Sequence, residues 1–361
     1  FLKLYRRIEE GTNPDVELPR HLTEEAGFPH APTYAGSIGW QRNLSSPVTL
    51  ALLLQFVPNE GDAWSFALDN VDSALSHALT LKGKLSALPE APTSMLAITA
   101  ESLPTVVRDV IGPVFVDMMS LLGQRTGEMH LALMSLHQSP EVTPEPFSLL
   151  YQKSLYQSIR GLTLKVFNEL EESLRVLDAP TAEAVRAVLA HRKAILNRLH
   201  RLMDRKMQAM KIRTHGDYHL GQVLYTGKDF VIIDFEGEPA RSLTERRLKQ
   251  SALRDVAGMI RSFHYAAQGS LLRRTDKQSV DIDYLRQWAD RWHCYVSGVF
   301  LQAYRRTVAD RRVVPADPAD FATLLETFLI EKAVYELGYE LHHRPDWLMI
   351  PVRGIEQTLK T

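Results

Sequence analysis

The sequence is poor in cysteine, in net charge and in long apolar runs. One cysteine in 361 residues, Cys294, excludes an internal disulfide and a cysteine-based metal cluster, and suits a reducing compartment. Lys plus Arg number 42 and Asp plus Glu 43, which gives no electrostatic case for nucleic acid or an acidic membrane. The longest apolar stretch, residues 50–57, is interrupted by Gln55 and is too short to cross a bilayer. We therefore expect a cytoplasmic protein that binds neither nucleic acid nor membranes.

Residues 1–57 have the pattern of a small α/β unit. The opening residues, Phe1–Tyr5, include no Met and already alternate like a strand, so we expect the sequence to start inside a longer polypeptide. Asn13-Pro14-Asp15 is a helix-start signal for a helix from Pro14 to about Ala26, with Pro19 as a candidate kink. Residues 48–57 read as a buried strand that ends in the turn 58–62.

Helical periodicity dominates from Trp64 onward and is interrupted at Ile212–Phe235. The Pro-rich stretch 139–146 predicts a surface connector. Within 212–235, a tight loop at His215-Gly216-Asp217 is followed by two short strands joined by the turn 226–229, which predicts a β-hairpin among helices. The expected helices are Trp64–Leu81, Thr93–Leu103, Pro104–Gln138, Phe147–Leu177, Thr181–Lys211 and Tyr284–Val308.

The hairpin carries polar residues at its mouth. Asp217 precedes the first strand and Asp234 ends the second, so the two carboxylates should lie close together. One base and one magnesium ligand in that arrangement suit phosphoryl transfer, and Gln222 adds an uncharged oxygen for a hard cation. The alternative is that His-Gly-Asp is an ordinary turn and that Asp234 is a solvated carboxylate at a strand end.

The segment resembles the catalytic and metal-binding loops of aminoglycoside-phosphotransferase-like kinases, which are relatives of protein kinases. Within that superfamily, residues 215–224 and 233–239 are similar to the maltokinases, which are often fused behind a trehalose synthase domain. The similarity extends over nearly the whole chain, including residues 2–7, 13–18, 56–59, 61–64, 253–259 and 331–336. It implies an α+β, protein-kinase-like bilobal fold with a truncated small N-lobe at 1–57 and a large, mostly helical C-lobe at 58–361 that carries the catalytic hairpin 212–235.

The resemblance also implies ATP and Mg²⁺ as cofactors. Asp217 would accept the proton of the sugar hydroxyl, and Gln222 and Asp234 would hold magnesium. Lys3 would contact the α- and β-phosphates and pair with Glu17. The alternative for that pair is an exposed strand lysine and a helix-surface glutamate.

Further residues have implied binding or supporting roles. The backbone of the hinge between the lobes would meet the adenine, at Gln55, Phe56 and Val57. Asp255 would brace the catalytic loop without touching substrate. The other supporting residues are His215, His219 and Glu236.

An aromatic group near the C-terminus is the candidate sugar site. Tyr335 and Tyr339 are four residues apart and share a helix face, and the helix should break before Pro345. Stacking on aromatic rings combined with charged groups suits a disaccharide, which favours Lys332, Tyr335, Tyr339, Arg344 and Trp347 as sugar ligands. The alternative is that the tyrosines belong to the core. Because Glu331 adjoins Lys332, the two cannot both face the sugar in the same way, and we favour Lys332.

The resemblance implies an ATP-dependent sugar kinase that converts maltose to maltose 1-phosphate in trehalose and glycogen (α-glucan) metabolism. Alternative acceptors are glucosamine or an aminoglycoside, and a third alternative is a catalytically silent module that docks on a covalent or separate trehalose synthase. In the family, two strands and a nucleotide-covering loop precede the lysine strand. We expect them in a preceding part of the polypeptide; without them, the nucleotide phosphates would be poorly covered.

Overall fold

The computed structural model describes residues 1–42, 46–85, 87–275 and 281–360. The N-terminal part is an antiparallel sheet in the order β1-β3-β2, formed by Leu2–Leu4, Val48–Leu54 and Tyr34–Trp40. Helix α1 spans Pro14–Glu24 and continues through Pro19 without a break. The Asn13 side chain caps it by accepting a hydrogen bond from the Asp15 amide at 3.0 Å.

Most of the remaining chain is helical, which confirms the expected α+β, kinase-like fold class. The long helices are α2 (Ala63–Leu81), α4 (Pro113–Met134), α5 (Leu149–Ser173), α9 (Leu253–Thr275), α10 (Ile282–Thr307) and α11 (Pro318–His343). The shorter helices are α3 (Thr105–Ile111), α6 (Ala179–Ala190), α7 (Arg192–His200), α8 (Leu243–Arg246) and α12 (Met349–Lys360). The 3₁₀ turns are η1 (Met95–Ala97), η2 (Ala100–Ser102), η3 (Arg201–Met203), η4 (Leu220–Gln222) and η5 (Pro345–Trp347).

Several expected helices are divided. The one expected at Thr93–Leu103 is replaced by the two 3₁₀ turns η1 and η2. The one expected at Pro104–Gln138 breaks at Gly112, whose φ of 90° is incompatible with a right-handed helix, and resumes at Pro113 as α4. The one expected at Thr181–Lys211 is divided into α6, α7 and η3, and its last two residues form strand β6 (Met210–Lys211).

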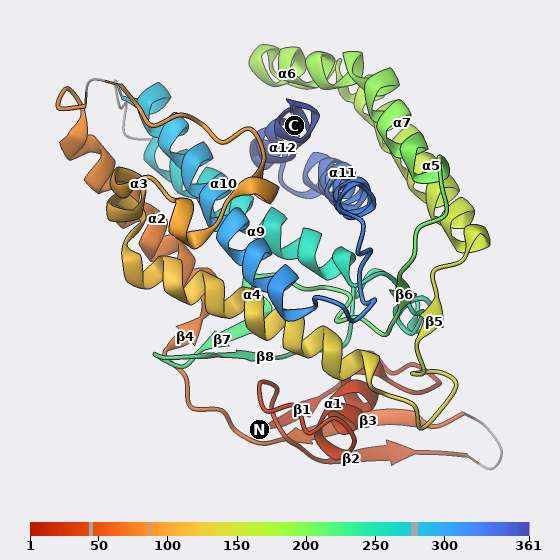
Figure 1. The fold of residues 1–361 in the computed structure, drawn as a ribbon. Helices are drawn as coiled ribbons and strands as arrows, with labels where there is room; N and C mark the ends of the chain where they lie inside the picture. The colour runs from red at the N-terminus through yellow and green to blue at the C-terminus, as the bar shows by residue number, and fades with distance from the viewer. Residues whose placement is uncertain (43–45, 86, 276–280, 361) are drawn as a thin grey trace.

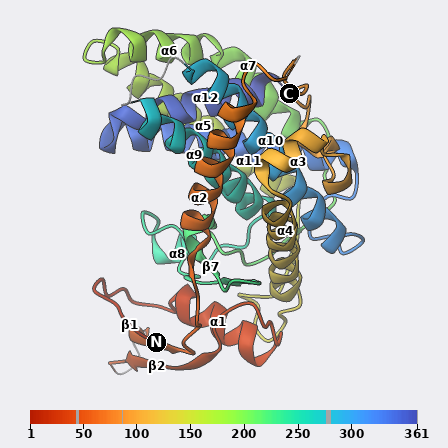
Figure 2. The ribbon, with the colours of Figure 1, turned by 90° about the vertical axis from the view of Figure 1, so that its left-hand side faces the viewer.

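The hairpin lies between the N-terminal sheet and the long helices, as Figures 1 and 2 show from two sides. Its strands are β7 (Val223–Tyr225) and β8 (Phe230–Ile232), and β4 (Gly61–Asp62) extends it to a three-stranded sheet in the order β4-β7-β8. A second small sheet pairs β5 (Glu145–Pro146) with β6. The hairpin is therefore not isolated, because a short strand after the expected hinge pairs with it.

The N-terminal part docks on the hairpin and on α4. The Ile232 amide in β8 donates to the His30 carbonyl at 2.8 Å. Arg125 of α4 donates two bonds to the Asp229 carboxylate at 2.9 and 2.8 Å, and the His30 ring lies 3.8 Å from Asp229 and 3.7 Å from Glu128. Phe28 is buried in the same apolar core as the C-terminal helices. The strand that leads to Asp234 is thus fixed to both parts of the molecule.

Close helix packing supports the hairpin from the other side. Helices α4 and α10 approach so closely that a Cβ atom at Gly123 would lie 2.1 Å from the Phe300 carbonyl oxygen. In the described residues, none of the helices combines the length and apolarity needed to cross a bilayer.

Candidate active site

Asp255 of α9 fixes the loop at residues 215–217. Its two carboxylate oxygens accept hydrogen bonds from the His215 and Gly216 amides at 2.8 and 3.0 Å. The carboxylate is buried and also contacts His130 Nε2 at 3.1 Å. Burial would raise the pKa of Asp255, but the hydrogen bond and charge of His130 lower it below its ordinary value. A carboxylate that is ionised at neutral pH therefore holds the loop that presents Asp217.

His215 links this loop to the second strand of the hairpin. Its Nε2 donates to the Ile233 carbonyl at 2.8 Å, directly before Asp234. Gly216 has φ of 86°, in the region that favours glycine, and a Cβ there would lie 3.1 Å from Gly237 Cα. The loop before β7 and the segment after β8 are therefore held in fixed positions relative to each other. Each of them carries one of the two predicted carboxylates.

Asp217 lies between two nitrogen donors. Lys332 Nζ of α11 is 3.9 Å from one carboxylate oxygen, and His219 Nε2 is 3.9 Å from the other. His219 Nδ1 accepts a hydrogen bond from the Gly221 amide at 3.1 Å, which places the proton of the neutral ring on Nε2, facing Asp217. Burial lowers the pKa of His219, although the Asp217 charge opposes it. Lys332 and His219 therefore flank the Asp217 carboxylate, one beside each oxygen.

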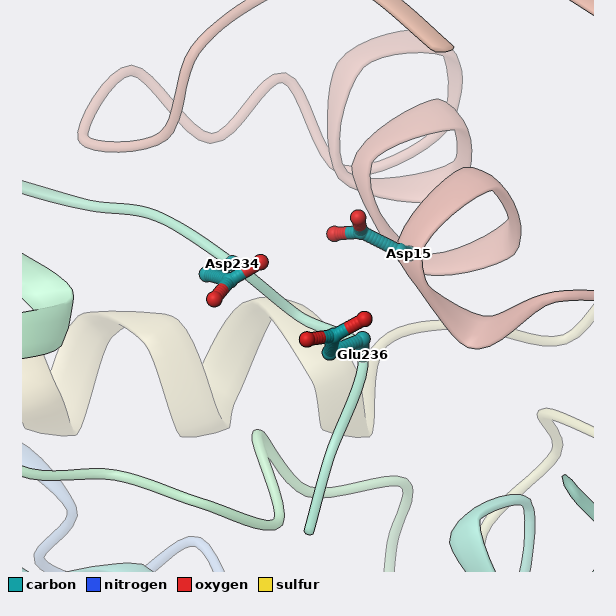
Figure 3. Close-up of side chains that lie close together, drawn as sticks. All are labelled: Asp15, Asp234 and Glu236. Carbon is teal, nitrogen blue, oxygen red and sulfur yellow. The ribbon is translucent and has the colours of Figure 1, made fainter. Parts of the chain in front are cut away.

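Asp15, Asp234 and Glu236 form a carboxylate cluster (Figure 3), with ligand oxygens within 4.8 Å of one another. Lys3 Nζ lies 2.6 Å from Asp15, contacts Asp234, and is 3.7 Å from Glu236. Burial opposes the charge of Lys3, but Asp15 and Asp234 hold its pKa above the ordinary value. The pKa of Glu236 is raised by burial and by the neighbouring carboxylates. Carboxylate oxygens gathered in this way suit a hard divalent cation.

The expected pairing of Lys3 with Glu17 is wrong. Lys3 meets Asp15, whereas Glu17 binds Arg213 at 2.6 Å and Arg247 at 2.9 Å. The reason is the geometry of α1, because side chains two residues apart on a helix point in nearly opposite directions. Asp15, in the first turn, faces the sheet lysine, and Glu17 faces Arg213, which precedes the loop at residues 215–217.

The other predicted nucleotide and metal residues lie beside these groups. Gln222 ends η4, and its carbonyl accepts from the Ile233 amide at 3.0 Å, which places it opposite the residue before Asp234. Gln55 follows β3 and accepts a hydrogen bond from the Thr33 hydroxyl at 2.7 Å. Phe56 is 67% exposed, and Val57 is partly buried in the connection to β4. Their roles stay predictions.

A pocket of about 80 Å³ opens beside Asp217. Lys332 and Tyr335, two of the predicted sugar ligands, line it, and their role stays a prediction. Glu331 lines it too and contacts Arg254. Sequence reasoning missed its remaining charged residues, since they come from separate segments that only the fold brings together: Glu238, Arg241, Glu245, Arg246 and Arg254.

Three predicted sugar ligands lie outside this pocket. Tyr339 is 42% exposed and stacks on His343 with ring centres 4.4 Å apart. Arg344 binds the buried Glu340 at 2.9 and 2.7 Å and covers the rings of Tyr339 and Trp347. The end of α11 thus forms a separate aromatic group beyond the pocket that holds Asp217.

Comparison with known proteins relates the chain to phosphotransferases. Residues 116–238 match the model of the phosphotransferase enzyme family, APH. A glucosamine kinase of Streptacidiphilus jiangxiensis is 24% identical over 307 residues, covering 85% of this chain and 57% of that protein. One from Mycolicibacterium smegmatis is 23% identical over 356 residues, covering 97% and 72%. The chain therefore spans little more than half the length of the first relative.

Solved structures support the same relation at the level of fold. A glucosamine kinase structure, crystal form B, superposes with a TM-score of 0.68 at 23% identity, covering 100% of this chain and 73% of that one. A glucosamine kinase in complex with glucosamine, ADP and inorganic phosphate gives a TM-score of 0.67 at 23% identity, covering 98% and 71%. The chain thus has the kinase-like phosphotransferase fold, and its residues 116–238 carry the sequence pattern of the phosphotransferase enzyme family.

Proposed function

We propose that this chain is an ATP-dependent kinase that transfers a phosphoryl group to a hydroxyl of a small sugar. The observation that carries the proposal is the pairing of two acidic sites across one hairpin, Asp217 in the acceptor pocket and Asp234 in the carboxylate cluster. His215 joins the two segments through its bond to the Ile233 carbonyl. In this proposal, residues 1–57 and 58–361 are two lobes with the nucleotide between them.

Each group has a separate task in the proposed reaction. Asp217 aligns the acceptor hydroxyl and accepts its proton, while Lys332 and His219 hold the carboxylate in place. Asp234 and Gln222, with Glu236 beside them, would hold Mg²⁺, which neutralises charge on the phosphates when bound. Lys3 would exchange its contact with Asp234 for the nucleotide phosphates and keep Asp15 as its partner. The hinge backbone at 55–57 would meet the adenine.

An amino sugar of the glucosamine type is the acceptor that we favour. Glu238 lines it and forms no ion pair among the described residues, so its carboxylate can meet a cationic amino group. Tyr335 lies against it, and the pKa of Tyr335 is raised to about 12 by burial and by the Glu238 charge. The names of the relatives agree with this choice.

Maltose remains the second candidate, on the sequence resemblance to maltokinases. It would need the pocket to extend toward Tyr339, Arg344 and Trp347, which now lie outside it. An aminoglycoside fits less well, because Glu331 is already neutralised by Arg254. A trehalose synthase partner would accompany the maltose activity.

The test is phosphate transfer from Mg-ATP to glucosamine, glucose, maltose and kanamycin, with N-acetylglucosamine as the control that lacks the amino charge. We expect glucosamine to be preferred. Replacement of Asp217 by Asn should lower kcat by about 10²- to 10⁴-fold. Glu238→Gln should erase the preference for glucosamine over glucose. A maltose preference that survives in Glu238→Gln would favour the second candidate.

A nucleotide-binding assay distinguishes an active phosphotransferase from a catalytically silent kinase-like module. A working site predicts that ADP raises Tm with Mg²⁺ present and raises it much less without the metal. Asp234→Asn should remove the metal-dependent part of the shift. The absence of any shift in the unchanged protein would favour the silent-module alternative.

A further inference from the structure

Glu17 makes a buried contact that the proposed chemistry does not use. Its side chain on α1 is 7% exposed and binds Arg213, which is fully buried, and Arg247, which is 28% exposed. Arg213 lies two residues before His215, and Arg247 lies in the segment that follows Asp234. One carboxylate of the N-terminal part therefore contacts both the segment that leads to Asp217 and the segment that follows Asp234.

The charges of this group depend on Glu17. Burial would raise the pKa of Glu17, but hydrogen bonds from Arg247 and the charge of Arg213 lower it. Arg213 has one hydrogen bond, to Glu17, and its Nε and Nη2 atoms are buried without a partner in the described structure. Removal of the Glu17 charge would leave this guanidinium uncompensated, so Arg213 is the group most sensitive to Glu17.

The two arginines come from segments that are themselves paired. Ile212 and Gln250 exchange backbone hydrogen bonds of 2.9 and 2.8 Å, one residue from Arg213 and three from Arg247. On its other side, the loop is held by Asp255. Glu17 thus connects α1 to the segment before the Asp217 loop, whereas Asp15, half a turn away, contacts Lys3.

We propose that Glu17 is a positioning residue for phosphoryl transfer, which sets the catalytic loop through Arg213 and takes no part in holding the nucleotide lysine. This inference rests on the proposed function. It assigns separate tasks to two acids of one helix. Asp15 serves nucleotide affinity through Lys3, and Glu17 serves turnover through the loop of Asp217.

The experiment compares Glu17→Gln with Asp15→Asn as the matched control on the same helix, by steady-state kinetics with Mg-ATP and the best acceptor. We expect Glu17→Gln to lower kcat by about tenfold or more with KM for ATP within about twofold, since small misplacements of reacting groups are costly. Asp15→Asn should raise KM for ATP instead. Glu17→Asp, which keeps the charge, should recover part of kcat.

Three outcomes would overturn the proposal. They are a rise in KM for ATP in Glu17→Gln equal to that in Asp15→Asn, a fall in Tm with kcat unchanged, and no recovery in Glu17→Asp. Should Glu17→Gln fail to fold, Glu17→Asp is measured in its place, because it keeps the charge but draws the carboxylate back from Arg213. It must then lower kcat and leave KM for ATP unchanged.

The proposed function can fail separately. If the unchanged protein phosphorylates no acceptor, the proposed function is refuted. The effect of Glu17 on the loop is then measured by hydrogen exchange of the His215 and Gly216 amides, which bond to Asp255. Glu17→Gln should accelerate their exchange and Asp15→Asn should not. Equal exchange in the two variants would overturn the inference.

Discussion

Replacement of Asp255 by Asn should destabilise the protein far more than its isosteric size suggests. Asp255 is 2% exposed and uses both oxygens to accept the His215 and Gly216 amides, with His130 as a third partner. Hydrogen bonds to a charged group contribute about 1.5–3 kcal/mol each. Asn keeps one acceptor oxygen and turns an NH₂ group toward the remaining donors. We therefore expect a loss of roughly 3–5 kcal/mol, as for other broken buried ionic contacts.

Asp290 provides the matched control. It accepts two side-chain amides, from Gln268 at 3.1 Å and Gln357 at 2.8 Å, through one oxygen that Asn retains. Burial raises the pKa of Asp290, whereas the pKa of Asp255 is lowered, so the charge of Asp290 is not favoured by its surroundings. Asp290→Asn should cost less than about 1 kcal/mol.

The assay is urea unfolding followed by circular dichroism at pH 7 and at lower pH. Because the folded-state pKa of Asp255 is lowered, its contribution is complete above the ordinary pKa of an aspartate and is lost as the pH falls through the folded value. The difference in free energy of unfolding between the unchanged protein and Asp255→Asn should therefore shrink in acid. Equal losses in Asp255→Asn and Asp290→Asn, or a difference that grows in acid, would refute this reasoning.

Two further predictions concern buried groups elsewhere. His293 packs against His264 with ring centres 4.9 Å apart. Burial and the Arg261 charge lower the pKa of His293 to about 3. Its contribution to the free energy of unfolding should therefore be complete above the ordinary pKa of a histidine and should fall as the pH drops below that value. Urea midpoints at pH 7 and 5 should differ by less in His293→Gln, and an unchanged difference would contradict this assignment. A Cβ at Gly354 would lie 1.9 Å from Arg261 Nη1, whereas one at Gly161 in α5 would meet nothing within 4 Å. Gly354→Ala should therefore lower Tm, and Gly161→Ala should raise stability by up to about 1 kcal/mol, because alanine favours the helix; similar Tm values for the two variants would count against the close packing.

The sequence was sufficient for the hairpin and for the start of α1. Polar residues flanking two short apolar strands, with a glycine turn between them, are local signals, and Asn13 caps the helix as expected. Strand β2 was not predicted, because Tyr34–Trp40 contains two glycines and has no clear alternation. It is a strand because it pairs with β3, and that pairing is tertiary information.

The partners of charged groups were harder to foresee than the elements that carry them. The expected partner of Lys3 was Glu17, but the observed partner is Asp15, two residues earlier. Which face of a helix turns toward a sheet depends on packing, and sequence spacing does not reveal it. Arg246 and Arg247 look like solvated turn residues in the sequence, yet Arg246 is 6% exposed and binds Glu9, and Arg247 binds Glu17. Burial of these groups follows from contacts between segments more than 200 residues apart.

The junction at His30 has a consequence for recombination between relatives. A chimaera that took residues 1–57 from a relative would import a new loop against β8, while Arg125, Glu128 and Asp229 stayed behind. The carbonyl of residue 30 would still meet the Ile232 amide, but the charges around it would no longer match. Chimaeras that keep these contacts matched should therefore exchange the hairpin turn and the contacting turn of α4 together with the N-terminal segment.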